Sequence, residues 1–107
     1  MTDARVVLVT VPSREEGERI AEAIVGEGLA ACVNIVGPIR SIYRWQGKLC
    51  RDDEHLLIVK TRRDRYGELE ARILDLHPYE VPEVISLAIQ EGAAPYLSWI
   101  YDQTGTS

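Results

Sequence analysis

Apolar residues occur along the chain in short runs that alternate with amphipathic stretches. Arg5–Val11 is an apolar, β-branched run of strand length, and Pro12 stops it. Ser13 and Glu16 then form a capping box ahead of apolar residues at helical spacing, and Gly28 supplies a left-handed stop. The first third of the chain is therefore predicted to form a strand followed by a helix.

A long hairpin is predicted next. Ala30–Val36 is a second apolar strand, and Gly37-Pro38 interrupts it at a place where a bulge is expected. From Ile39 to Trp45 the residues alternate, and Gln46-Gly47 is typical of a hairpin tip. After the charged Arg51–Glu54 segment, we expect the third strand over residues 55–60.

The second half of the chain is predicted to contain a helix, a proline-rich loop, a strand and a last helix. Thr61 is predicted to cap a second amphipathic helix that runs to Leu76. His77–Glu83 cannot be helical, because each proline disfavours helix in the residue before it. Val84–Ile89 is a fourth strand, and Ala94-Pro95 begins a short last helix.

This order predicts an α+β fold, the ferredoxin-like βαββαβ (split βαβ) sandwich with an extra C-terminal helix, as a single domain over residues 1–107. The first and third strands, which lie centrally in that plan, carry the unbroken apolar runs. Two helices can cover only one face of the sheet. The other apolar face must meet the last helix, another subunit or both, so we predict an obligate oligomer.

Charge and cysteine content narrow the classes of partner. The net charge of −5 argues against nucleic acid and anionic membrane surfaces, because both require a basic footprint. No apolar run approaches the roughly 20 residues of a membrane helix, so direct membrane insertion is not expected. Cys32 and Cys50 are isolated, which favours reduced thiols and a cytoplasmic location. No organic cofactor is predicted, because the chain has no Gly-rich phosphate loop.

Four segments together resemble the CutA divalent-cation tolerance family. They are Cys32–Ile35, Ser41–Lys48, Lys60-Thr61 and His77–Glu83, and the similarity continues in order to Trp99. The resemblance implies a ferredoxin-like protomer in a tight homotrimer, similar in shape to the PII signalling proteins. It also implies a role in tolerance to copper and other divalent cations.

A divalent metal, copper above all, is the candidate cofactor, with His77, Cys32 and Glu80 as candidate ligands. The alternative is that His77 bonds locally at the end of the second helix and that Cys32 is a small buried hydrophobe. Some family members carry a cysteine near the end of the first strand and a second histidine before the proline-rich segment. Here those positions are Val9 and Leu76, so that form of copper site is not carried over.

Polar and aromatic residues on the strands and the proline-rich loop suggest a ligand-binding cleft between subunits, for a small molecule or an anion. Lys60 would supply charge, Asn34 and Tyr79 hydrogen bonds, and the aromatic residues an apolar wall. Alternatively, these groups satisfy one another across a subunit interface. The candidates are Asn34, Tyr43, Trp45, Glu54, Lys60, Tyr79 and Glu80.

These observations predict a homotrimeric divalent-cation tolerance protein that responds to metal ions such as copper through metal or small-ligand binding, without catalysis. An oligomeric scaffold or signalling partner of another protein, such as a membrane protein, is the alternative; the identity of such a protein partner is not predicted. A small hydrolase is less well supported, because the sequence positions no Ser-His-Asp or Cys-His set.

Overall fold

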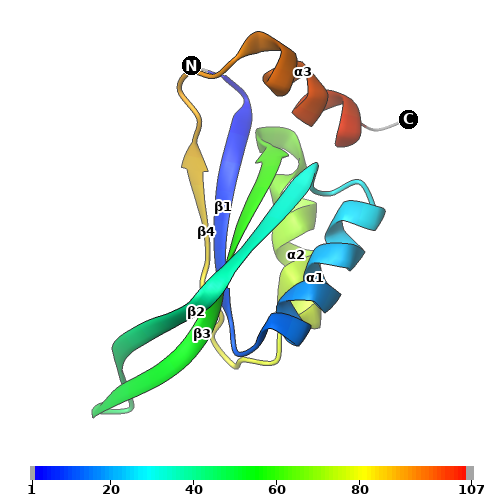
Figure 1. The fold of residues 1–107 in the computed structure, drawn as a ribbon. Helices are drawn as coiled ribbons and strands as arrows, with labels where there is room; N and C mark the ends of the chain where they lie inside the picture. Colours follow the sequence, from blue (N-terminus) through cyan, green and yellow to red (C-terminus); the bar gives the residue numbers. More distant parts are fainter. Residues whose placement is uncertain (1, 106–107) are drawn as a thin grey trace.

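Four antiparallel strands form one sheet in the order β2-β3-β1-β4, as Figure 1 shows for residues 2–105, which the computed structural model describes. Helices α1 and α2 lie side by side on one face of this sheet, and α3 lies at one end of it. The elements are β1 (Ala4–Val11), α1 (Arg14–Gly26), β2 (Cys32–Trp45), β3 (Lys48–Arg62), α2 (Tyr66–Leu76), β4 (Val84–Ala88) and α3 (Ala94–Gln103), with a 3-10 turn over Arg63–Arg65.

The element order and the central position of β1 and β3 confirm the predicted ferredoxin-like plan. On the covered face, alternate strand residues pack against both helices and are fully buried. This core consists mainly of Val7, Val9, Val11, Leu57 and Val59 from the sheet and Ile20, Ile24, Leu69 and Ile73 from the helices. No helix within residues 2–105 is long and apolar enough to cross a membrane.

Local sequence signals begin and end the elements as expected. The Ser13 hydroxyl accepts a hydrogen bond of 3.1 Å from the Glu16 amide at the start of α1. Gly28 adopts φ 73° just after that helix. At the hairpin tip, Gln46 and Gly47 both have positive φ values of 50° and 77°, the geometry that a two-residue hairpin turn requires. The Ser13 cap, the Gly28 stop and the Gln46-Gly47 turn are confirmed, whereas the Glu16 carboxylate of the predicted capping box accepts from Arg19.

Two predictions are wrong. The strand β3 begins at Lys48, because the charged residues 51–54 pair with β2 and can point away from the core on an uncovered hairpin. Thr61 does not cap α2; it lies in β3, where its buried hydroxyl donates to the Leu29 carbonyl at 2.7 Å. Arg65 precedes α2, with no side-chain cap.

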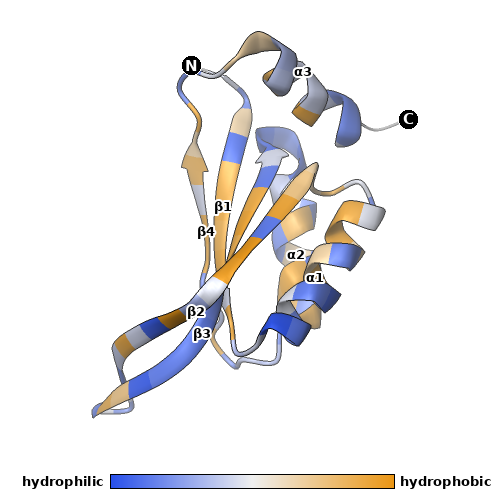
Figure 2. Ribbon diagram, viewed as in Figure 1, coloured by the Kyte–Doolittle hydropathy of each residue, from blue (hydrophilic) through white to orange (hydrophobic). Residues whose placement is uncertain are grey.

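The face of the sheet opposite α1 and α2, here called the open face, carries the second apolar set. Register and alternation place eleven residues on it: Val6, Leu8, Thr10, Cys32, Asn34, Val36, Leu56, Ile58, Lys60, Ile85 and Leu87. Val36, Ile85 and Leu87 are between 44% and 52% exposed in the protomer. Figure 2 shows the hydrophobic stretches along β1 and β4 that contribute to it.

The last helix packs at the end of the sheet instead of across the open face. Its buried Ile100 contacts Ala4 and Ala31, beside the start of β1. At the opposite end, residues 39–54 of β2 and β3 continue as a hairpin beyond β1, whose last residue, Val11, pairs with His55. This extension, here called the hairpin arm, projects past both covering helices (Figure 1).

Candidate functional site

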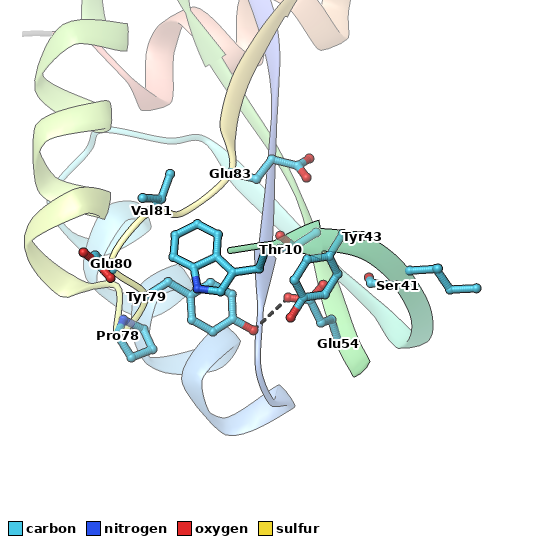
Figure 3. Close-up of a pocket in the computed structure, with 11 residues that line it drawn as sticks. Thr10, Ser41, Tyr43, Glu54, Pro78, Tyr79, Glu80, Val81 and Glu83 are labelled. Atoms are coloured by element: carbon cyan, nitrogen blue, oxygen red, sulfur yellow. Dashed lines mark hydrogen bonds between the residues drawn. The ribbon is translucent and has the colours of Figure 1, made fainter. Parts of the chain in front are cut away.

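A groove of about 660 Å³ lies where the hairpin arm leaves the sheet. Its volume falls within the range of small-molecule sites. One wall comes from the arm and the other from the loop of residues 78–83 between α2 and β4, as Figure 3 shows. The lining residues are Thr10, Ser41, Ile42, Tyr43, Trp45, Glu54, Pro78, Tyr79, Glu80, Val81 and Glu83.

A hydrogen bond between Tyr79 and Glu54 joins the two walls. The Tyr79 hydroxyl donates to the Glu54 Oε2 at 2.7 Å, and the two side chains meet across the groove in Figure 3. Glu54 is the first residue of β3 beyond the end of β1, and it is only 7% exposed. Burial and the neighbouring Glu54 carboxylate both raise the pKa of Tyr79, so its hydroxyl stays a donor at neutral pH.

The arm contributes a second tyrosine–carboxylate pair at the rim. Tyr43 donates to Asp52 from the adjacent strand, and this hydrogen bond is the main reason that the pKa of Tyr43 is raised to about 12. Trp45 lies two residues farther along the same face of β2, and both aromatic rings are 41% exposed. The arm therefore presents an aromatic surface to the groove.

The groove is acidic. Glu54, Glu80 and Glu83 line it, and no lysine, arginine or histidine of residues 2–105 does. The sequence suggested a pocket for a small molecule or an anion, and within one protomer this acidic lining disfavours an anion. Lys60, expected to supply the positive charge, lies outside the groove, and so does Asn34.

Lys60 and Asn34 form a separate cluster on the open face. The Lys60 ammonium donates to the Asn34 side-chain oxygen, and its Nζ lies 4.0 Å from the Cys32 Sγ. Tyr96 of α3 adjoins the same cysteine, and burial together with Cys32 raises its pKa. The seven predicted cleft residues therefore divide within one protomer: five line the groove and two belong to this cluster.

His77 uses both of its ring nitrogens in the protein. The Nδ1 accepts from the Tyr79 amide at 3.1 Å, so the Nε2 carries the proton and donates to the Thr10 carbonyl at 2.7 Å. The side chain is 7% exposed and follows directly after α2, whose Ile73 carbonyl accepts from its amide. Its local bonding at the end of the helix matches the second of the two predicted roles.

The three candidate metal ligands do not meet in one protomer. His77 contacts Thr10 near the end of β1. Cys32 lies at the other end of the sheet, because it pairs with Lys60 of β3, and Lys60 pairs with Val6 near the start of β1. Glu80 is exposed on the loop. Among residues 2–105, no group of three or more His, Cys, Asp or Glu side chains is placed to hold a metal ion.

Sequence reasoning missed several lining residues. Glu83 belongs to the same proline-rich segment as Tyr79, and its charge was a usable signal. Ser41 shares a strand face with Tyr43, so strand alternation also pointed to it. Thr10 gave no such signal, because its place in the groove depends on where β1 ends relative to the arm.

Comparisons with known proteins agree over nearly the whole chain. The family model "CutA1 divalent ion tolerance protein" matches residues 5–103. The "Divalent-cation tolerance protein CutA" of Thermus thermophilus is 53% identical over 100 residues, which cover 94% of this chain and 97% of that protein. A solved structure of the divalent cation tolerance protein from Thermus thermophilus superposes with a TM-score of 0.93 at 52% identity, covering 95% of this chain and 99% of that one.

A plant relative has the same fold. The crystal structure of CutA1 from Oryza sativa has a TM-score of 0.93 at 48% identity and covers 97% of this chain and 95% of that one. Both the matched length and the matched arrangement of strands and helices lead to one assignment. The chain belongs to the CutA1 divalent ion tolerance family.

Proposed function

We propose that the chain forms a homotrimer in the cytoplasm, and that this trimer serves tolerance to divalent cations such as copper by binding a metal or small ligand, without catalysis. The observation that carries the proposal is the apolar open face. Neither covering helix lies on it, α3 reaches only its end near Cys32, and Val36, Ile85 and Leu87 remain about half exposed. Large exposed apolar patches mark protein–protein contacts.

The hairpin arm supports the same proposal. Both strands of the arm leave the sheet without backing from another layer, and Ile42 and Leu49 on it are 63% and 57% exposed. A second copy that covers the open face could also pack against this arm. The number of three copies comes from the family resemblance.

The role in cation tolerance and the absence of catalysis rest on the family description. The matching family and the Thermus thermophilus relative are both named for divalent-cation tolerance and not for an enzymatic reaction. A trimer would carry about −15 on one assembly, three times the net charge of −5. Such a field attracts divalent cations even though His77, Cys32 and Glu80 do not meet in one protomer.

Sedimentation equilibrium tests the assembly. We expect a mass of about 36 kDa, three times the 12.0 kDa of the chain, at micromolar concentration. Ile85→Glu places a charge on the open face and should reduce the mass toward that of the monomer. Val25→Glu is the matched control, because Val25 is 41% exposed on α1, the opposite layer. A folded wild-type monomer would refute the proposed trimer.

Calorimetry with Cu²⁺, Zn²⁺ and Ni²⁺ tests the metal part. We expect binding tighter than millimolar if the trimer assembles a dedicated site, and a weaker affinity in His77→Ala if that residue is a ligand. Binding no tighter than millimolar, unchanged in His77→Ala, would reject a dedicated metal site at that residue.

A further inference from the structure

We propose that the groove between the hairpin arm and the loop of residues 78–83 binds an organic cation, specifically an elongated amine such as a diamine or polyamine. The inference rests on the proposed function, which is the binding of a metal or small ligand without catalysis, and it names the chemical class of that small ligand. Three features of the groove carry it: the distribution of its charge, its aromatic walls and one buried carboxylate.

The carboxylates surround the groove instead of converging on one point. Glu54 lies at the base of the arm, while Glu80 and Glu83 extend from separate positions on the opposite loop (Figure 3). A compact metal ion needs its ligands within about 2–2.6 Å of one centre. No such group of acidic, histidine and cysteine side chains exists among residues 2–105. Separated charges suit a ligand whose own positive charges are separated by a chain of methylene groups.

Aromatic side chains line both walls of the groove. Tyr43 and Trp45 line the arm side, and Tyr79 lines the loop side. An ammonium group held over the face of a tryptophan or tyrosine is attracted by the ring quadrupole, and the methylene chain of an amine packs on the same rings. With no basic residue in the lining, nothing in the groove opposes a cation.

Glu54 provides an anchor for one ammonium group. The residue is 93% buried, and its Oε2 accepts a hydrogen bond from Tyr79. Its Oε1 has no hydrogen-bond donor among the side chains of residues 2–105, although the carboxylate lines the groove. This oxygen is not among the fully buried atoms that lack a partner, so it is open to the groove, where an ammonium group can donate to it.

Isothermal titration calorimetry of the assembled wild-type protein with spermidine tests the proposal, at a fixed ionic strength of about 0.15 M, where nonspecific surface attraction is screened. We expect a saturable site, one per protomer. Glu54→Gln and Trp45→Leu should each weaken the affinity about tenfold, since each removes an interaction of the size that a buried ion pair or a cation–π contact supplies. Circular dichroism checks that both variants fold. If Glu54→Gln does not fold, Glu83→Gln at the exposed rim of the groove replaces it.

Glu22→Gln is the matched control. Glu22 is exposed on α1, outside the groove, and its substitution removes the same unit of charge. We expect its affinity for spermidine to stay within about twofold of wild type. Equal weakening by Glu22→Gln and Glu54→Gln, or a titration that never saturates, would show general charge attraction and overturn the proposal. The proposal would also be overturned if Mg²⁺, at the concentration used for spermidine, displaced spermidine from the groove as effectively as unlabelled spermidine does.

The outcome is separable from that of the proposed function. A trimer by sedimentation that does not bind spermidine would reject the organic cation and leave the trimer in place. This includes the case in which a side chain from a second copy fills the groove. A wild-type monomer that binds spermidine would instead reject the trimer and keep the groove.

Discussion

The hydrogen bond between Tyr79 and Glu54 is expected to contribute more to the free energy of unfolding than an exposed hydrogen bond would, although the pair lines an open groove. Tyr79→Phe removes the only side-chain donor, among residues 2–105, to a carboxylate that is 7% exposed. Hydrogen bonds to charged groups contribute about 1.5–3 kcal/mol, and the cost rises when the remaining partner is buried. We therefore expect Tyr79→Phe to lower the free energy of unfolding by about 2 kcal/mol.

A second tyrosine–glutamate pair in the same chain is the control. Tyr66 donates to Glu70 at 2.8 Å, nearly the same length, but the two residues lie one turn apart on α2 and the acceptor is partly exposed. Water can replace the lost donor there. Tyr66→Phe should therefore cost only about 0.5 kcal/mol, the size of a pair within one helix.

Urea denaturation at a fixed protomer concentration measures both values, since the proposed assembly would make stability depend on concentration. A double-mutant cycle with Glu54→Gln then isolates the charge. In the Glu54→Gln background, Tyr79→Phe should cost about 1 kcal/mol or less, because a neutral acceptor loses less. The reasoning fails if Tyr79→Phe costs no more than Tyr66→Phe, or if its cost is the same with glutamate and glutamine at position 54.

Three further predictions concern the protomer. A Cβ on Gly37 would lie 2.5 Å from the His55 ring, so Gly37→Ala should cost about 1–3 kcal/mol in urea denaturation, and most of that loss should vanish in a His55→Ala background. Thr61→Val leaves the Leu29 carbonyl without its buried donor and should lower the unfolding free energy by about 1–2 kcal/mol in the same assay; no loss would contradict the hydrogen bond. Burial and then the hydrogen bond to its partner raise the pKa of Tyr66 to about 12. Because the unfolded chain releases this proton first, near pH 10, stability should fall from pH 10 upward, and less steeply in Tyr66→Phe when thermal unfolding is followed against pH.

The sequence predicted the order of the elements because local signals and hydrophobic period agreed at most boundaries. Ser13 capped α1 and Gln46-Gly47 turned the hairpin as expected. The start of β3 was missed for a physical reason. Residues 51–54 are charged, which suggests a loop, but on an arm without a covering layer neither strand face must be apolar.

The candidate site was predicted only in part. Residues of the proline-rich loop and of the arm were chosen for their chemistry, and five of the seven do share a groove. The other two, Asn34 and Lys60, lie on β2 and β3 like the groove residues, but several residues away along those strands. The sequence analysis began β3 after Glu54, and so it did not foresee that Glu54 and Lys60 lie about 20 Å apart along one continuous strand. Lys60, the one positively charged residue of the predicted set, therefore lies outside the acidic groove.

The groove and the open face share one side of the sheet, and this links assembly to ligand binding. Alternation along β3 places Glu54 on the same side as Leu56 and Ile58, so the groove begins where the open face ends. A second copy that covered the open face would border the groove and hold the arm, which in the protomer is joined to the loop through the Tyr79–Glu54 bond. Assembly should therefore pre-organise the groove, and a ligand that links arm and loop should in turn favour assembly, because the two equilibria are coupled reciprocally. An affinity for spermidine that does not change between wild type and a monomeric Ile85→Glu variant would contradict this coupling.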